Sequence, residues 1–327
     1  MISYIIRRIL LMIPVLFLIS VVSFVLIQLP PGDFLSTYLA RIEMQELTVS
    51  QSTIDRLTRQ YGLDQPVYVQ YFVWVGNMFR GDFGDSFLYQ RPIGEMIGSR
   101  IGMTVLLGLS TIVFTWLVGV PIGIYSATHQ YKLSDHFWTF VGFIGLSTPN
   151  FVLALVMMYL SFVWFDFIPS GLFSQEFANA PWSIPKLLDF LAHLWLPVVI
   201  LGTAGTAGII RVMRGRHLAV LGEDYIQTAR AKGVRESVVI YKHAVRNAIH
   251  PLIMSLGEVL KNVVSGATIV AIVLSLPTVG PLLFEALMSQ DMYLAGTLIM
   301  FQSFFLVIGY LLADILLAAI DPRVTYT

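Results

Sequence analysis

Apolar residues in this chain gather into six long runs that are separated by polar stretches. A helix needs a run of roughly 20 apolar residues to cross the hydrocarbon core of a bilayer. The pattern therefore predicts an all-α polytopic membrane protein with six transmembrane helices. The runs cover residues 9–29, 101–127, 136–165, 193–212, 252–275 and 293–320.

The first run begins directly after Arg7 and Arg8 and ends at Gln28-Leu-Pro-Pro-Gly32. A secretory signal also begins with positive charge, but its apolar region is shorter and ends at a small-residue cleavage site. We therefore expect an uncleaved span whose N-terminus lies in the cytoplasm.

The charges of the polar segments indicate how the spans are oriented, because cytoplasmic loops carry an excess of Lys and Arg. Residues 30–100 hold six Arg against eight acidic residues, which is typical of an external, periplasmic segment. Residues 211–250 hold eight of the chain's twenty Lys and Arg residues and predict a cytoplasmic loop. Both termini are then cytoplasmic, and the chain divides into residues 1–29 with the first span, the external segment 30–100, and a core domain 101–327 with five spans.

Composition narrows the function classes. Only 12% of the residues are charged, against about 25% in soluble domains, and the mean hydropathy is +0.76. Zero formal net charge argues against a nucleic-acid partner, and the absence of Cys excludes disulfides, thiolate metal sites and Cys nucleophiles. The chain has no Walker A glycine–lysine loop for ATP. We therefore expect no catalytic, cofactor or metal site in this chain and do not expect it to be an enzyme.

Two helices are predicted inside the basic loop 211–250. Residues 223–232 form the first and end at Gly233, because Gly adopts the left-handed conformation that commonly follows a helix. By their spacing, Tyr225, Ile226 and Ala229 share one face of this helix.

The second helix of the loop covers about 235–249. Pro251 is expected to move His250 away from helical geometry and so to end the helix. The apolar stripe predicted for it consists of Val238, Tyr241, Val245 and Ile249.

The run Glu223-Asp-Tyr-Ile-Gln-Thr-Ala-Arg-Ala-Lys-Gly233, followed by His243-Ala-Val-Arg-Asn-Ala-Ile-His-Pro251, resembles the coupling loop of ABC-importer permeases. More narrowly, it is similar to their dipeptide, oligopeptide and nickel branch. The general permease motif has Glu-Ala-Ala where this chain has Gln227-Thr228-Ala229, and the interval from Gly233 to Pro251 is longer than in the sugar-importer branch. Both departures agree with the peptide branch. The resemblance extends over essentially the whole chain in further motifs, among them Tyr61-Gly-Leu-Asp-Gln-Pro66, Gly81-Asp-Phe-Gly-Asp-Ser86 and Asp321-Pro-Arg323.

The resemblance implies a permease subunit of an ATP-driven importer that works by alternating access in the bacterial inner membrane. Its cargo would be peptides or, alternatively, oligosaccharides or a nickel chelate. The implied partners are a second homologous permease subunit, two ABC ATPase subunits that bind ATP and Mg, a periplasmic substrate-binding protein, and membrane lipid. The residues implied to couple to the ATPase are Glu223, Asp224, Tyr225, Thr228, Ala229, Ala231, Lys232, Gly233, Arg246 and Asn247.

Two ionisable residues lie inside the fifth apolar run. Glu258 and Lys261 are three positions apart and can neutralise one another. Charges within a membrane are costly and tend to face a cavity or a partner, which favours a place along the translocation path. A structural ion pair that fixes helix packing, or a pair that reaches the membrane interface, is equally compatible with the spacing.

Small residues and prolines predict how the spans pack. Prolines at 121 and in Ser147-Thr-Pro149 predict kinks. Glycines let helix backbones approach closely, and they recur at positions 119, 123, 142, 145, 202, 205 and 208.

Two other function classes agree less well with the sequence. An ion-coupled secondary transporter predicts internal inverted repeats and buried charges in several spans, whereas the buried charges here cluster in one span and no repeat is evident. A membrane enzyme needs a convergent set of catalytic groups. Its nearest candidates, Asp82 and Asp85, lie in a Gly-rich turn where Asp is favoured for local hydrogen bonding.

Overall fold

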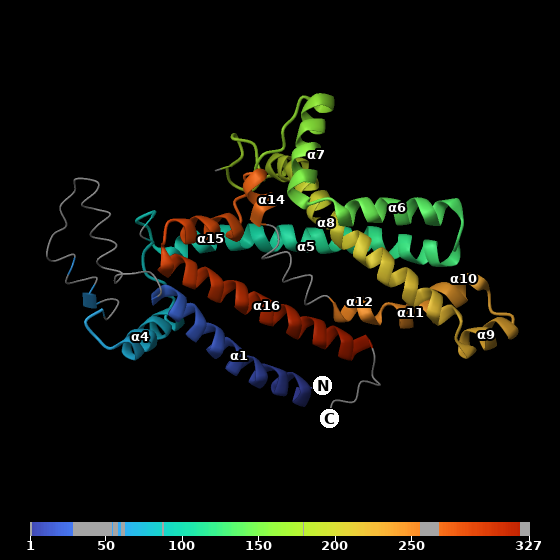
Figure 1. Ribbon diagram of the computed structural model, residues 1–327, viewed down its shortest axis with the longest axis horizontal. Coiled ribbons are helices and arrows are strands. Elements are labelled where there is room, and N and C mark those ends of the chain that lie inside the picture. The colour runs from blue at the N-terminus through green and yellow to red at the C-terminus, as the bar shows by residue number, and fades with distance from the viewer. Residues whose placement is uncertain are drawn as a thin grey trace. The chain divides into compact units, whose positions relative to one another are not determined.

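The computed structural model describes residues 2–28, 54, 58–59, 63–86, 88–178, 180–255 and 268–320. In these residues the regular structure is helical, apart from an isolated antiparallel bridge between Asp85 and Pro92 (Figure 1). The elements are α1 (Ile2–Gln28), α4 (Val67–Phe79), α5 (Ile93–Thr128), α6 (Leu133–Ser147), α7 (Asn150–Phe165), α8 (Ile184–Leu221), α9 (Asp224–Ala231), α10 (Glu236–Val238), the π-helix η1 (Val239–Ala244), α11 (Val245–Ala248), α12 (His250–Met254), α14 (Thr268–Val273), α15 (Val279–Met288) and α16 (Met292–Ile320).

Four of these helices are long and apolar enough to cross a membrane: α1, α5, α8 and α16. The helices α6 and α7 meet at an angle of 107° and add a fifth crossing if the bent pair counts as one span. Half of the predicted run 252–275, residues 256–267, lies outside the described part of the chain.

Residues 136–165 do not form the single kinked helix that the sequence predicts. The chain breaks at Thr148, whose φ of −88° and ψ of 122° are extended, and α7 starts after Pro149. Proline has no N–H to donate and disfavours the helical conformation in the residue before it, and here the helical ladder stops. Pro121, in contrast, lies inside the uninterrupted helix α5.

The helix α8 is much longer than the predicted span 193–212. It begins after Ser183, whose hydroxyl accepts a hydrogen bond from the Lys186 N–H at 3.3 Å, and it runs for 38 residues to Leu221. At 1.5 Å per residue the helix is about 57 Å long, well beyond the roughly 30 Å of a hydrocarbon core. The first residues of the predicted loop 211–250 are therefore the last turns of α8.

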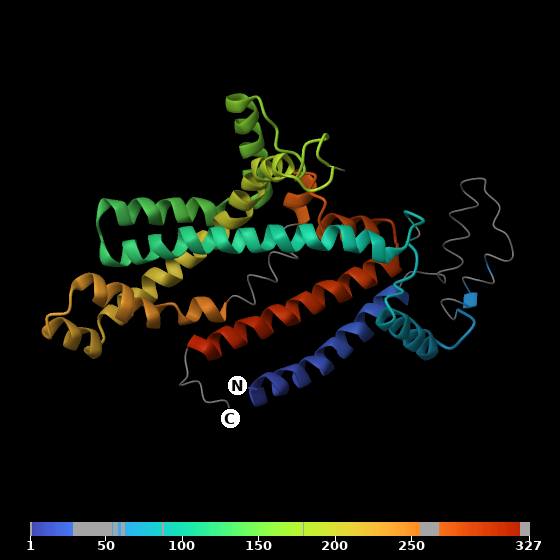
Figure 2. The same ribbon diagram turned by 180° about the vertical axis from the view of Figure 1, so that it is seen from behind.

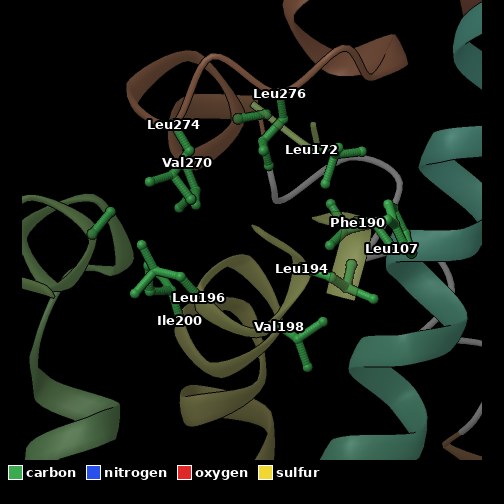
Figure 3. Packing of buried hydrophobic residues seen from close by; sticks show 12 residues of the cluster. Leu107, Leu172, Phe190, Leu194, Leu196, Val198, Ile200, Val270, Leu274 and Leu276 are labelled. Carbon is green, nitrogen blue, oxygen red and sulfur yellow. The ribbon is translucent and has the colours of Figure 1, made fainter. Parts of the chain in front are cut away.

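The chain forms two compact units. Unit 1 comprises residues 1–5, 103–281 and 306–327, and α8 is its central helix. Figure 3 shows side chains of α8 packing with Leu107 of α5 and with the segment around α14. The labelled members of this buried cluster are Leu107, Leu172, Phe190, Leu194, Leu196, Val198, Ile200, Val270, Leu274 and Leu276.

Glycines bring α5 and α6 close to α8, as the sequence predicts. A Cβ added at Gly123 of α5 would lie 2.7 Å from Cβ of Met213, and one added at Gly145 of α6 would lie 2.6 Å from Cγ2 of Thr203. The prediction is wrong for Gly208, because no heavy atom of the described residues comes within 4 Å of a Cβ added there. Tight contacts also occur at Gly119, Gly202 and Gly205, whereas Gly142 makes only an ordinary contact.

Unit 2 comprises residues 6–102 and 282–305, which include most of α1, all of α4, and parts of α5, α15 and α16. The turn between α4 and α5 is held by Asp291, a fully buried carboxylate at the start of α16. This carboxylate accepts hydrogen bonds from the Ser86 hydroxyl at 2.6 Å and from the Leu88 N–H at 3.1 Å. The turn also contains Asp82, which accepts a local bond from the Gly84 N–H at 3.0 Å, as expected for an Asp in a turn rather than a catalytic acid.

Candidate functional site

The helix α9 lies directly after α8, at the end of α8 that is remote from α7 (Figures 1 and 2). Its bounds, Asp224–Ala231, confirm the predicted helix 223–232 within one residue at each end. Asp224 lies in the first turn, where a negative charge is favourable beside the helix dipole. The Thr228 hydroxyl donates back to the Asp224 carbonyl at 2.9 Å.

Gly233 ends α9 in the way the sequence predicts. Its φ is +73°, in the left-handed region that a side chain disfavours. The Gly233 N–H donates to the Arg230 carbonyl at 2.9 Å, and the Val234 N–H donates to the Ala229 carbonyl at 3.2 Å. These two bonds form a Schellman motif, which satisfies carbonyls that the helix end would otherwise leave unpaired.

One face of α9 packs inward. Ile226 is fully buried together with Val239 and Ala244, and Ala229 and Val234 pack against this cluster. The prediction that Tyr225 shares one face with Ile226 and Ala229 is wrong, because Tyr225 is 42% exposed whereas Ile226 is buried. The Tyr225 hydroxyl instead accepts a hydrogen bond from Nδ2 of Asn247 at 2.7 Å, so the structure brings two of the predicted coupling residues together.

The second helix of the loop differs from the continuous helix predicted over 235–249. It is divided into α10, the π-helix η1 and α11. The buried residues Val239 and Ala244 are five positions apart, which is the repeat of π-helical hydrogen bonding. The wider turn rotates the buried face, and Tyr241, predicted in the apolar stripe, is 66% exposed.

The prediction that Pro251 moves His250 out of helical geometry is also wrong, since His250 is the first residue of α12. Proline is tolerated in a first helical turn because the N–H it lacks has no intrahelical partner there. The main-chain break falls at Ile249, between α11 and α12.

An ion pair spans the turn at Gly233. The Arg230 guanidinium donates from Nη2 to Oε1 of Glu236 at 2.6 Å and from Nε to Oε2 at 3.1 Å. This hydrogen bonding holds the pKa of the Glu236 carboxyl below its usual range. Both side chains are substantially exposed, at 34% and 54%, so solvent screens the pair and its role is to hold the turn rather than to provide much stability.

Most of the predicted coupling residues form an exposed surface on this loop. Ala229 is the exception among the side chains, because it packs inward. The exposed coupling residues are Glu223, Asp224, Tyr225, Thr228, Ala231, Lys232, Arg246 and Asn247.

Glu258 and Lys261, predicted along the translocation path, lie outside the described residues.

A buried ion pair that sequence reasoning missed anchors the base of this loop. Asp135, in the first turn of α6, has a side chain only 2% exposed. The Arg214 side chain of α8 donates to it twice, from Nε to Oδ1 at 2.9 Å and from Nη2 to Oδ2 at 2.7 Å, and the Tyr131 N–H adds a bond at 3.1 Å. The signal for this pair in the sequence is weak: Asp135 directly precedes the apolar run 136–165, and Arg214 is one of several cations in the basic loop 211–250.

The arrangement holds a short helix rigidly and exposes a polar face, but it assembles no reactive groups. Among the described residues, no three His, Cys, Asp or Glu side chains lie close enough together to hold a metal ion.

Comparison with known proteins covers nearly the whole chain. The family described as binding-protein-dependent transport system inner membrane component matches residues 119–326, and the N-terminal family of the same membrane components matches residues 1–108. The oligopeptide transport system permease protein AppB of Bacillus subtilis is 36% identical over 327 residues, with full coverage of both chains. A putative peptide permease protein of Brucella ovis is 34% identical over 330 residues, and the dipeptide transport system permease protein DppB of Alkalihalophilus pseudofirmus is 32% identical over 341 residues, again with full coverage.

Proposed function

Since the chain belongs to the family of binding-protein-dependent transport system inner membrane components, we propose that it is the permease subunit of an ATP-driven importer that carries peptides across the inner membrane. Peptides are favoured over oligosaccharides or a nickel chelate because the relatives at 36%, 34% and 32% identity are all named for peptide transport. In this function the chain pairs with a second permease subunit and with two ATPase subunits that bind ATP and Mg. A periplasmic binding protein delivers the peptide.

The proposed topology has six spans with both termini in the cytoplasm. Four long helices and the bent pair α6–α7 account for five spans, and the apolar run 252–275 accounts for the sixth. The basic loop after α8 then faces the cytoplasm, in accordance with the positive-inside rule. Glu258 and Lys261 belong to this run, the fifth along the chain, and we assign them to the translocation path.

The proposed coupling element is α9 with its exposed surface. An ATPase subunit binds this surface from the cytoplasmic side, and closure of the two ATPases displaces α9. Three features transmit the displacement: Ile226 is buried in the cluster behind α9, the Schellman motif fixes its far end, and α8 continues directly from it into the membrane. Because α8 is held to α6 by the buried Asp135–Arg214 pair, a push on α9 moves packed helices rather than a loose loop.

The single observation that carries this proposal is the closed Schellman end of α9 at Gly233. Gly233→Pro tests it, because proline requires a φ near −65° and removes the N–H that donates to Arg230. We expect the variant to insert into the membrane and to assemble, but to lose peptide-stimulated ATP hydrolysis in vesicles that contain the complete importer.

Gly222→Ala is the matched control at the other end of α9. Gly222 has a φ of −83°, and an added Cβ meets only the Ala219 carbonyl at 3.4 Å, so alanine should leave stimulated hydrolysis unchanged. Normal coupling in Gly233→Pro would show that α9 is not the docking helix.

A further inference from the structure

Unit 2 contains an apolar cavity of about 440 Å³ between α1, α4 and α16. Its walls are side chains from these three helices and from Phe83 in the turn after α4. The lining residues are Ile13, Leu16, Phe17, Ser20, Tyr71, Val75, Met78, Phe79, Phe83, Met300, Phe301 and Phe304.

The contacts of α4 place this cavity at membrane depth. Gln70, near the start of α4, bonds Gln28 at the end of α1 at 3.0 Å, but the next residue, Tyr71, reaches inward to bond Ser20 at 2.7 Å. Phe24 of α1 contacts the rings of Tyr71 and Trp74, at centroid distances of 5.5 and 5.7 Å. In the proposed topology the C-terminal end of α1 lies at the outer face, so α4 lies beside the outer half of this candidate span rather than in the water outside it.

The composition of α4 agrees with this depth. Val67–Phe79 contains no charged residue, although it lies within the polar segment 30–100. Its exposed side chains are apolar or aromatic, including Phe72 and Phe79, which is 89% exposed. Thirteen residues make a helix of about 20 Å, too short to cross the membrane, so α4 is an apolar helix embedded in the outer leaflet.

The cavity has no hydrogen-bond donor to spare for a polar ligand. Its two hydroxyl groups belong to Ser20 and Tyr71. Ser20 donates to the Phe17 carbonyl at 2.7 Å, so the Tyr71 hydroxyl is the donor of the Ser20–Tyr71 bond. Both hydroxyl hydrogens are therefore used, and only the lone pairs of two oxygens remain to replace the hydration of a peptide or an ion. Most polar groups of such a ligand would be left unpaired, which costs several kcal/mol. A hydrocarbon chain carries no such cost.

The cavity opens onto the exposed apolar surface of the chain. Ile13 and Phe17 of α1 and Phe304 of α16 line the cavity and are also among the exposed apolar side chains. Both helices are membrane spans, so an acyl chain can enter sideways from the bilayer without crossing water. We propose that this cavity is a binding site for one acyl chain of an outer-leaflet phospholipid, which fills the space between α4 and the two spans. The site is independent of the solute that the transporter carries.

The test uses the complete transporter in vesicles that contain phosphatidylethanolamine with a diazirine at the end of one acyl chain. After illumination, peptide mass spectrometry measures adducts on Met300 and Phe301 relative to those on Leu10 and Leu18, which are exposed on α1 and serve as the bulk-lipid reference. We expect enrichment on the cavity residues. A ratio near one, meaning that the cavity residues are labelled no more than the bulk-lipid reference residues, would overturn the proposal.

Val75→Trp fills the cavity and should reduce the ratio by about tenfold, which corresponds to lost room for one to two methylene groups. Val67→Trp is the matched control, since Val67 is exposed on the same helix and does not line the cavity, and it should leave the ratio unchanged. A second measurement does not depend on a bulky variant: benzoylphenylalanine in place of Phe304 should crosslink to phospholipid. A crosslink to the second permease subunit, or to another segment of this chain, would assign the cavity to a protein side chain and refute the lipid site.

Discussion

Gly123→Ala tests how closely α5 and α8 pack. An added Cβ would lie 2.7 Å from Cβ of Met213, 3.0 Å from Cγ of Met213 and 3.1 Å from the Ile210 carbonyl oxygen. Met213 is fully buried, and two of the three clashing atoms belong to the backbone or are attached directly to it. Rotation of a flexible side chain therefore cannot relieve the clash, and the two helices must separate by several tenths of an ångström.

The expected cost follows from two opposing terms. Overpacking a tight interface costs about 1–3 kcal/mol, while Gly→Ala inside a helix gains about 0.5–1 kcal/mol from conformational entropy. Gly123→Ala should therefore destabilise the protein by about 1–2 kcal/mol. Gly208→Ala is the control within α8, because no heavy atom lies within 4 Å of its added Cβ, and it should stabilise by about 0.5–1 kcal/mol.

The assay is thermal unfolding of the purified protein in mild detergent, followed by the loss of the monodisperse peak in size-exclusion chromatography. The two variants should shift the transition temperature in opposite directions. Equal shifts, or a neutral Gly123→Ala, would mean that α5 and α8 are not in contact at this glycine and would refute the packing described here.

Two further predictions concern ion pairs. Arg214→Gln leaves the buried Asp135 carboxylate unpaired and should destabilise the protein by about 3 kcal/mol, whereas the double variant Asp135→Leu, Arg214→Met should recover most of this loss; additive losses in thermal unfolding would show that the two residues do not interact. The Arg230–Glu236 pair should stabilise the Gly233 turn fully at pH values above 4.5, the ordinary pKa of a glutamate carboxyl. The stabilisation should be lost as the pH falls through the pKa of Glu236 in the folded protein, which lies below 4.5. The protection factors of the turn amides, which compare the measured exchange with the intrinsic exchange at the same pH, should therefore fall in acid for the native chain and stay constant in Glu236→Gln. A loss of protection in acid that persists in this variant would assign the effect to another group.

The features that the sequence predicts correctly are governed by local interactions. The helix α9 and its end at Gly233 follow from a short helical run and from one residue that tolerates a left-handed backbone. Long apolar runs likewise predict α1, α5 and α16 without knowledge of their neighbours. The glycine contacts at 123 and 145 were expected in kind, although the sequence does not indicate which helix each glycine faces.

The errors occur where the outcome depends on the environment of the segment. The apolar stripe that includes Tyr241 was predicted from the α-helical repeat of 3.6 residues. The buried cluster behind α9 instead contains Val239 and Ala244, which a π-helical turn places on one side. A proline predicts a break, as at Pro149, but it does not predict an angle of 107°, which depends on what each half of the pair packs against. The extension of α8 to Leu221 is not predicted by the apolar run 193–212, because the run ends where polar residues begin whereas the helix continues through them.

By itself, the sequence determined that this is an inner-membrane permease with a helical fold, and where the helix α9 begins and ends. Hydrophobicity, charge and backbone preference act over a few residues, so they can be recognised in a single segment. Only the tertiary structure decided that Arg214 pairs with Asp135, that Tyr225 bonds Asn247, and that α4 and two spans enclose an apolar cavity. These contacts join segments that are distant along the chain, and their energies depend on burial and geometry that arise only once the helices have packed.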